Sequence, residues 1–206
     1  MRIAVFGATG GTGQQVVQQA LAGGHAVTAL VRDPARLAQH DVRLTVVQGD
    51  VLDRSRVDET IAGADAMIVS LGNTANNPDY VVSRGTQVIV DAMTDAGSPC
   101  RLIVVTSLGV GDSRDQVPFA FKMLMSTVLK KPMEDKERQE ALVRASNLDW
   151  VIVRPGGLTN GPATGDYKAG VNVKLTASQV SRADVAAFVL QQLDNDTYLR
   201  QAAAIT

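Results

Sequence analysis

The first thirteen residues, MRIAVFGATGGTG, constrain the fold more than any other part of the chain. Residues 3–6 form an apolar run that predicts a short strand, and Gly7, Gly10 and Gly13 follow it at intervals of three. From about residue 12 to residue 22, apolar residues recur on one face, which predicts a helix directly after the glycines. A strand, a glycine turn and a helix in this order are typical of the first half of a βαβ unit.

Each of these glycines has an expected place in a phosphate-binding turn. Gly7 allows the tight turn, Gly10 lets the backbone approach a pyrophosphate, and Gly13 lets the helix pack closely on the strand. The diphosphate of a dinucleotide would meet free N–H groups at the positive end of the helix, with the hydroxyls of Thr9 and Thr12 beside it. The spacing is G-x-x-G-x-x-G rather than G-x-G-x-x-G, so a purely structural turn is the alternative.

Apolar runs and helical stretches alternate along the rest of the chain. The predicted strands are residues 2–7, 26–31, 44–48, 66–70, 101–107 and 150–154. The predicted helices after the first are residues 54–62, 81–96 and 134–145. Continuous apolar strands separated by helices indicate a parallel sheet covered on both faces. We therefore expect an α/β fold with a doubly wound parallel sheet, one domain over residues 1–206, and a ligand crevice at the strand C-termini.

Charge and composition exclude several classes of function. The chain has 20 basic and 21 acidic residues and a formal net charge of −1, so no basic excess is present to bind nucleic acid or an anionic membrane surface. The apolar runs are too short to span a membrane. The first strand begins at once, which leaves no room for a signal peptide. We expect a cytoplasmic protein with no nucleic-acid or membrane partner.

The cysteine and histidine content argues against a disulfide and a metal site. Cys100 is the only cysteine, and we expect it to be a small, partly buried filler rather than a reactive thiol. His25 and His40 lie far apart near predicted turns, without metal-ligand spacing, and are expected at the surface. No metal ion is therefore expected.

The end of the second predicted strand, ALVRDPARL, bears on the choice between NAD and NADP. NAD enzymes place an acidic residue there for the ribose 2′-hydroxyl, whereas NADP enzymes place a cation near the 2′-phosphate. Arg32 and Arg36 are the candidate cations, and Asp33 is the competing acid. Asp33 followed by Pro34 also fits a helix N-cap, which would turn the carboxylate away from the ribose. This pattern favours NADP(H); the alternative is that both arginines are solvated surface residues.

Two further strand ends are expected to line the adenosine part of the groove. Asp50 and Val51 follow the third strand and are placed to meet the adenine; capping of the next helix is the alternative role of Asp50. Leu71 and Gly72 follow the fourth strand and are expected beside the ribose.

Two long connections, residues 109–131 and 155–174, interrupt the alternation and follow strand C-termini. Long loops in this position usually bind substrate, so both are expected to overhang the nicotinamide end of the crevice. The first contains a Met- and Phe-rich segment, residues 118–129, which fits either a core helix or an apolar lid.

Five motifs, GATGGTG, ALVRDPARL, VVQGDVLD, VTSLGVG and RASNLDWVIVRPGGLTNGP, together resemble the atypical short-chain dehydrogenase/reductases, which have a Rossmann fold. Within these, the chain is most similar to NADPH-dependent flavin reductase/biliverdin-IXβ reductase and to NmrA-like proteins. The resemblance implies that the cofactor phosphates contact Gly7, Thr9, Gly10, Thr12, Gly13, Arg32 and Arg36. It implies that the adenosine contacts Asp50, Val51, Leu71 and Gly72, and that the nicotinamide lies beside Thr106, Ser107, Pro155, Gly156, Gly157 and Leu158.

The chain departs from the alcohol dehydrogenases of this superfamily at one catalytic position. Those enzymes use Tyr-x-x-x-Lys, in which the lysine lowers the pKa of the tyrosine. Lys136 aligns with that lysine, but Pro132 stands where the tyrosine would be. The missing tyrosine argues against alcohol oxidation and sugar-nucleotide epimerisation. The Arg-Pro-Gly-Gly segment also replaces the histidine-bearing segment of the mammalian bilin reductases, which argues against a bilin as the physiological substrate.

A site without this tyrosine suits acceptors whose reduced form takes a proton readily from water. We expect an NADPH-dependent reductase of a small planar conjugated acceptor such as a flavin, biliverdin or a quinone, in a monomer or weak homodimer. Ser107 is expected to orient the nicotinamide or the acceptor, and Lys136 either binds the nicotinamide ribose or is merely solvated. The alternatives are a non-catalytic NADP(H) sensor that binds a protein partner, and a reductase or isomerase of another small carbonyl compound.

Overall fold

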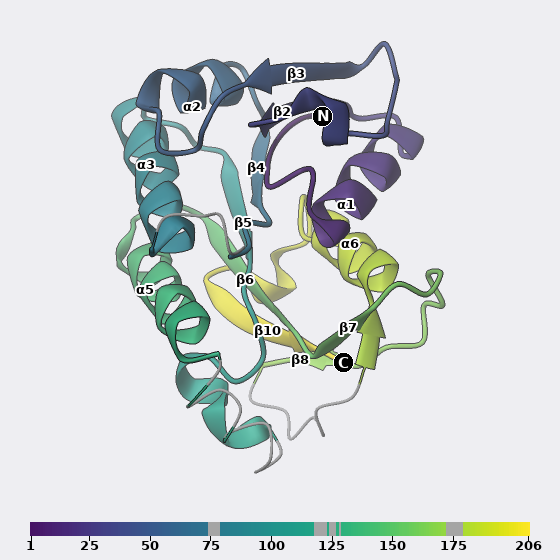
Figure 1. Cartoon of the computed structure of the whole chain (residues 1–206), viewed down its shortest axis with the longest axis vertical. Coiled ribbons are helices and arrows are strands. Elements are labelled where there is room, and N and C mark those ends of the chain that lie inside the picture. The colour runs from purple at the N-terminus through teal and green to yellow at the C-terminus, as the bar shows by residue number, and fades with distance from the viewer. Residues whose placement is uncertain (74–78, 118–122, 124–126, 128, 172–178) are drawn as a thin grey trace.

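An eight-stranded sheet in the order β3-β2-β1-β4-β5-β6-β10-β8 forms the centre of the protein in the computed structural model (Figure 1). The structure describes residues 1–73, 79–117, 123, 127, 129–171 and 179–206. The strands of the sheet are β1 (Arg2–Phe6), β2 (Ala26–Val31), β3 (Leu44–Gln48), β4 (Ala66–Val69), β5 (Arg101–Val105), β6 (Trp150–Pro155), β8 (Ala169–Gly170) and β10 (Gln201–Ile205). All pair in parallel except β8, which is antiparallel to β10.

Helices cover both faces of this sheet. Those with regular α-helical structure are α1 (Gly11–Ala22), α2 (Arg54–Ile61), α3 (Val81–Asp95), α5 (Lys130–Ala145) and α6 (Arg182–Gln191). Figure 1 shows α1 and α6 on one face and α2, α3 and α5 on the other. A small second sheet pairs β7 (Gly157–Thr159) with β9 (Gln179–Ser181).

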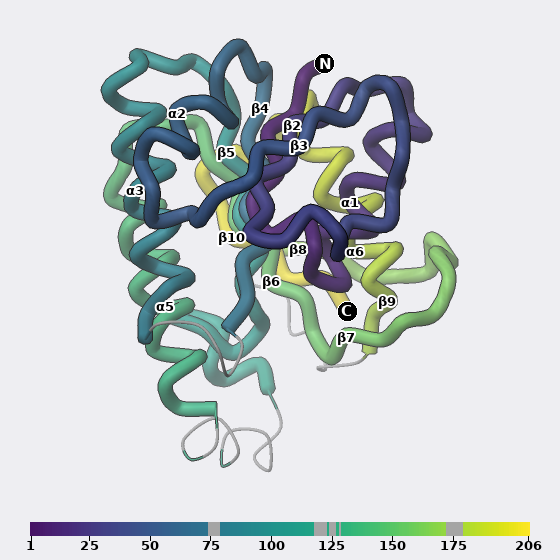
Figure 2. The backbone as a smooth tube through the Cα atoms, turned by 45° about the horizontal axis from the view of Figure 1, so that its top comes forward, coloured from purple at the N-terminus to yellow at the C-terminus, as the bar shows by residue number. Residues whose placement is uncertain are grey.

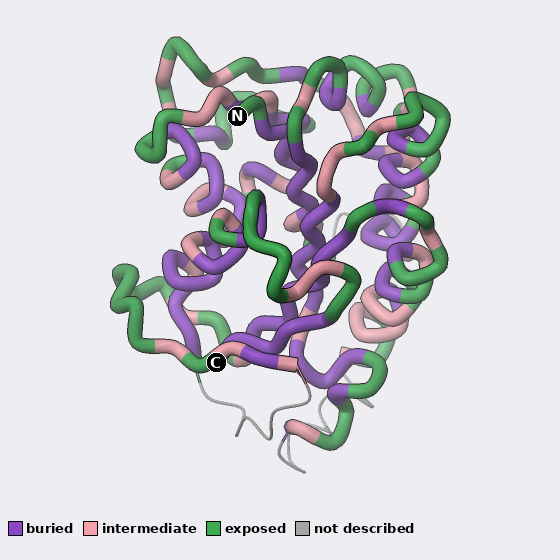
Figure 3. Tube along the Cα trace, turned by 180° about the vertical axis from the view of Figure 1, so that it is seen from behind, coloured by how far each residue is buried: buried purple, intermediate pink, exposed green. Residues whose placement is uncertain are grey.

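Side-chain alternation along the strands divides the apolar interior into two cores. On β1, Ile3 and Val5 pack into the core beneath α1 and α6, whereas Ala4 and Phe6 pack into the core beneath α2, α3 and α5. All four are essentially inaccessible to solvent. Figure 3 shows the buried residues concentrated along the strands and on the helix faces that meet them. A strand buried on both sides explains the continuous apolar run in the sequence.

The order in which successive strands are added to the sheet changes direction between β1 and β4. From β1 the sheet grows one way through β2 and β3, and the other way through β4, β5 and β6. Helices α1 and α3, which follow β1 and β4 in the chain, lie on opposite faces of the sheet, as Figures 1 and 2 show. Such a switch point is where open α/β sheets bind their ligands.

The predicted doubly wound parallel sheet is confirmed, with six of its strands in the expected places. The elements after residue 156 were not predicted, namely β7, β8, β9, α6 and β10. Helix α5 begins at Lys130, before the predicted start at residue 134, and β5 ends at Val105 rather than at residue 107.

The two long connections differ in how far the structure describes them. In the first, a 3-10 turn at Gly111–Gln116 is described, but residues 118–122, 124–126 and 128 are not. The choice between lid and core helix for residues 118–129 thus lies outside the described residues. The second connection contains β7 and β8. Within the described part of the chain, no helix combines the length and apolarity needed to cross a membrane.

Candidate functional site

A cavity of about 500 Å³ opens at the C-terminal ends of the central strands, at the switch point of the sheet. Most of the predicted site residues line it. From the strand ends β1 to β4 come Gly7, Thr9, Gly10, Thr12, Arg32, Arg36, Asp50, Val51, Leu71 and Gly72. From β5, α5 and the segment after β6 come Thr106, Ser107, Lys136, Pro155, Gly156 and Leu158. Gly13 and Gly157 are absent from the described lining.

The glycine turn between β1 and α1 has the geometry expected of a phosphate site. Gly7 has a φ of +86°, and a Cβ there would lie 2.4 Å from the carbonyl oxygen of Ser70, so only glycine fits. A Cβ on Gly13 would lie 2.1 Å from the Gly7 carbonyl oxygen, which explains why Gly13 packs helix against strand instead of lining the cavity. Helix α1 has no side-chain N-cap and no acidic residue in its first turn. Its positive end therefore faces the cavity uncompensated.

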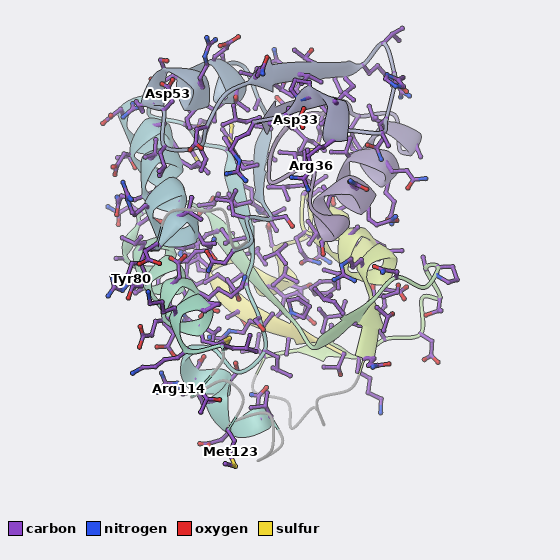
Figure 4. All side chains as sticks on the ribbon, viewed as in Figure 1. Asp33, Arg36, Asp53, Tyr80, Arg114 and Met123 are labelled. Carbon is purple, nitrogen blue, oxygen red and sulfur yellow. The ribbon has the colours of Figure 1, made fainter. Side chains whose placement is uncertain are left out.

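The turn after β2 separates the two arginines from the competing acid. The Asp33 carboxylate accepts a hydrogen bond from the Ala35 N–H (3.1 Å) and caps the 3-10 turn that Pro34 begins. The predicted capping role of Asp33 is confirmed. Arg32 and Arg36 line the cavity, whereas Asp33 is absent from its lining. Figure 4 labels Asp33 and Arg36 on this turn.

After β3, the Asp50 carboxylate lies in the cavity wall and accepts from the Leu52 N–H (2.9 Å). Asp53, not Asp50, caps α2 by accepting from the Ser55 N–H (3.0 Å). The alternative in which Asp50 caps the next helix is therefore wrong.

At the far end of the cavity, Lys136 projects from α5 toward the end of β5. Its ammonium group donates to the backbone carbonyl of Thr106 (3.1 Å). Burial lowers the pKa of Lys136 to about 8, although the negative charges of Glu140 and Asp135 oppose this change. The Ser107 hydroxyl beside it donates to the Leu108 carbonyl (3.1 Å). Lys136 is therefore charged at neutral pH and readily gives up a proton.

Behind Lys136 lies a buried charge network that the sequence did not predict. The Glu140 carboxylate accepts from Arg154 through Nε (2.9 Å) and Nη2 (2.6 Å), and from the Thr106 hydroxyl (2.8 Å). Both Glu140 and Arg154 side chains are 4% exposed. Arg154 also pairs with Asp112 (2.5 Å). Burial disfavours the charged form of Arg154, but the hydrogen bonds that it donates to Glu140 raise its pKa, so the arginine stays charged. The network fixes Thr106, whose carbonyl holds Lys136.

Asp135, next to Lys136 in sequence, joins α5 to α3. Its buried carboxylate accepts from the N–H groups of Val82 (3.0 Å) and Ser83 (2.8 Å) in the first turn of α3. Tyr80 precedes that turn with a left-handed φ of 58°, and Arg138 of α5 lies 3.9 Å from the centre of its ring. Figure 4 labels Tyr80 at this junction. These contacts set the position of α5, and so of Lys136, against the sheet.

No tyrosine belongs to the described lining of the cavity. Tyr80 lies between α3 and α5, and Tyr167 and Tyr198 pack against Phe188. The described residues also contain no group of three or more His, Cys, Asp or Glu side chains that could hold a metal ion. Cys100 is partly buried, in agreement with its expected role as a small filler, and its thiol donates to the Ala64 carbonyl (3.0 Å).

Arg182 is a lining residue that sequence reasoning missed. It is the first residue of α6 and donates through Nη1 to the Asn160 side-chain oxygen (2.7 Å). A signal for this helix start was present, because Ser181 and Asp184 form the Ser-x-x-Asp pattern of a helix N-terminus. In the structure the Ser181 hydroxyl accepts from the Asp184 N–H (2.9 Å).

Solved structures share this architecture over the whole chain. ChuY from Escherichia coli O157:H7, described as an anaerobillin reductase, is 29% identical and superposes with a TM-score of 0.84, covering 100% of this chain and 96% of ChuY. A short-chain dehydrogenase/reductase from Veillonella parvula in complex with NADP has a TM-score of 0.80 and covers 99% of this chain and 93% of that one. At 20% identity it shows the fold alone.

Sequence relatives include fungal oxidoreductases. Oxidoreductase stcQ from Emericella nidulans is 30% identical over 217 residues, covering 94% of this chain and 77% of stcQ. Reductase pytE from Aspergillus terreus is 28% identical over 239 residues, covering 93% of this chain and 90% of pytE. A family model described as NAD(P)H-binding matches residues 7–196. The chain therefore belongs to the NAD(P)H-binding family and has its Rossmann-like fold.

Proposed function

We propose that this protein is an NADPH-dependent reductase that delivers hydride to a planar conjugated acceptor of the flavin, bilin or quinone type. One observation carries the proposal. A single cavity joins the open N-terminus of α1 to a half-buried lysine, and no tyrosine lies in its described lining. This combination suits binding of a dinucleotide and reduction of an acceptor whose protonation needs no tyrosine.

The preference for NADPH rests on the turn after β2. Arg32 and Arg36 line the cavity there, and the carboxylate of Asp33 is occupied by the Ala35 N–H. A dianionic 2′-phosphate fits two guanidinium groups, whereas Asp33, the acid that would accept from a ribose 2′-hydroxyl, is absent from the described lining.

The likeness to ChuY, described as an anaerobillin reductase, supports reduction as the reaction and a bilin-type acceptor among the candidates. The relatives stcQ and pytE support an oxidoreductase more generally. In this chain the apolar side chain of Leu158 lines the cavity beside Gly156 and is 37% exposed, so it offers a surface for a flat ring.

The bound dinucleotide supplies a hydride from C4 of its reduced nicotinamide. The residues of the protein bind the dinucleotide, orient its nicotinamide and give a proton to the reduced acceptor. Lys136, fixed by the Thr106 carbonyl, places its positive charge beside the reduced acceptor, gives that acceptor a proton and is reprotonated from water. Ser107, whose hydroxyl is held by the Leu108 carbonyl, orients the nicotinamide.

The test is steady oxidation of NADPH, followed by absorbance, with FMN, biliverdin or a quinone present. We expect turnover with at least one acceptor, a lower KM for NADPH than for NADH, and none of this in a variant that cannot bind the dinucleotide. Tight NADPH binding without oxidation by any of these acceptors would contradict the reductase and favour the non-catalytic sensor.

A further inference from the structure

Arg182 lies over the glycine turn, although it comes from the other end of the chain. Helices α1 and α6 lie side by side in both Figure 1 and Figure 2, and Arg182 is the first residue of α6. A Cβ built on Gly11 would lie 2.8 Å from both Cδ and Nε of Arg182. The absence of a side chain at Gly11 therefore makes room for the arginine beside the cavity.

The guanidinium group of Arg182 is held in place without an acidic partner. Its bond to Asn160 is to a neutral oxygen, and in the part of the chain that the structure describes no carboxylate forms an ion pair with it. The nearby Asp184 is occupied, since its carboxylate accepts from the N–H groups of Thr164 and Gly165 and from the Ser181 hydroxyl.

Positive charge thus accumulates at this point of the cavity. The uncapped first turn of α1, which contains no acidic residue, contributes the positive end of its helix dipole. Arg182 adds a full charge next to this turn, in the lining of the same cavity. A fixed cation with a free face and a helix N-terminus together form a site for an anion with several oxygens.

We infer that Arg182 binds the diphosphate of the dinucleotide beside the first turn of α1. This inference rests on the proposed function and deepens it, because it divides the phosphates between two groups of arginines. Arg32 and Arg36 read the 2′-phosphate and thereby distinguish NADPH from NADH. Arg182 contacts the part that both dinucleotides share, so it contributes affinity without discrimination.

The experiment measures dissociation constants by calorimetry for three ligands: NADPH, NADH and adenosine 2′-monophosphate, which lacks the diphosphate. For Arg182→Gln we expect both dinucleotides to bind about 10- to 100-fold more weakly, the range for a lost charged hydrogen bond, with adenosine 2′-monophosphate unchanged. Arg182→Lys, which keeps the charge, should recover part of the loss. Arg32→Gln should show the opposite pattern, weakening NADPH and adenosine 2′-monophosphate but not NADH.

Arg54→Gln is the matched control for a change in net charge, because Arg54 is an exposed residue of α2 paired with Asp58. It should leave all three constants unchanged. Arg182→Gln binding both dinucleotides within twofold of wild type would overturn the inference, as would an equal loss for adenosine 2′-monophosphate. A wild-type protein that binds neither dinucleotide would instead overturn the proposed function.

Discussion

The two ends of the cavity depend on different structural features. At the diphosphate end, backbone groups of the β1–α1 turn form most of the site, glycines hold that turn in shape, and the Arg182 side chain lies beside it. At the reacting end, the side chains of Thr106 and Lys136 are positioned by a buried ion pair from distant parts of the chain. The diphosphate end depends on the space left around the backbone of the glycine turn. The reacting end depends on the buried ion pair between Glu140 and Arg154. The two ends should therefore fail in different ways.

The largest expected effect is at the backbone end. In Gly10→Val the fold should survive, because a Cβ there has only the Gly7 carbonyl oxygen nearby, at 3.4 Å, but the branched side chain occupies the space of the diphosphate. We expect no measurable NADPH binding by calorimetry and a thermal midpoint close to wild type. Gly161→Ala, where a Cβ meets Thr159 Oγ1 at 3.9 Å, is the control and should bind normally. Retained NADPH affinity in Gly10→Val would remove the phosphate site from this turn.

A substitution in the charge network behind the reacting end should lower the stability of the protein more than its affinity for the dinucleotide. Glu140→Gln leaves Arg154 buried with only Asp112 as a charged partner, and we expect a loss of about 3–5 kcal/mol in the free energy of unfolding. The exposed pair Arg56–Glu59 on α2 is the control, since Glu59→Gln should cost at most about 1 kcal/mol in urea unfolding. Equal losses at the two pairs would mean that the buried network does not support the reacting end.

Lys136→Met should lower the rate of NADPH oxidation about a hundredfold, within the range for a proton donor. Because burial lowers the pKa of Lys136 to about 8, the charged form predominates below that pH and is lost as the pH rises through it. The wild-type single-turnover rate should therefore fall above pH 8, and Lys136→Arg should remove that fall. A wild-type rate that is flat from pH 7 to about pH 9.5 would rule out Lys136 as the donor.

Arg32→Glu tests the adenosine part of the cavity, where we expect side chains to bind the 2′-phosphate. We expect NADPH binding to weaken by about 1.5–3 kcal/mol, the value of a charged hydrogen bond. NADH, which has no 2′-phosphate, should be little affected. The measurement is a pair of calorimetric titrations, and an equal loss for both dinucleotides would show that Arg32 does not read the 2′-phosphate.

The smallest expected effect is that of Ser107→Ala. If Ser107 only orients the nicotinamide, its loss should reduce the single-turnover rate roughly tenfold, about 1.4 kcal/mol on the barrier, with NADPH affinity nearly unchanged. A loss of more than about a thousandfold, together with a large solvent isotope effect in the wild type, would make Ser107 the proton donor instead.

The parts of the fold that were predictable depend on contacts between near neighbours in sequence. The glycine turn and the apolar strands β1 to β6 carry their signals within a few residues. Strand β10 reads QAAAI, and its alanines give only a weak strand signal, so it was missed. Helix α6 was missed although Ser181 and Asp184 carry a local signal for its start. The charge network joins Thr106, Glu140 and Arg154 across 34 and 14 residues, and no local pattern pairs these three side chains.

The contact between Asp135 and the start of α3 has a consequence for the order of folding. The first N–H groups of a helix have no partner within it, and Tyr80 provides no side-chain cap for α3. Two of those groups donate to the carboxylate of Asp135, 52 and 53 residues later in the chain. Helix α3 is therefore synthesised with an incomplete end, which is closed when α5 docks. We therefore expect the two helices to fold as one cooperative unit, in which the step that completes α3 also brings Lys136 to the cavity.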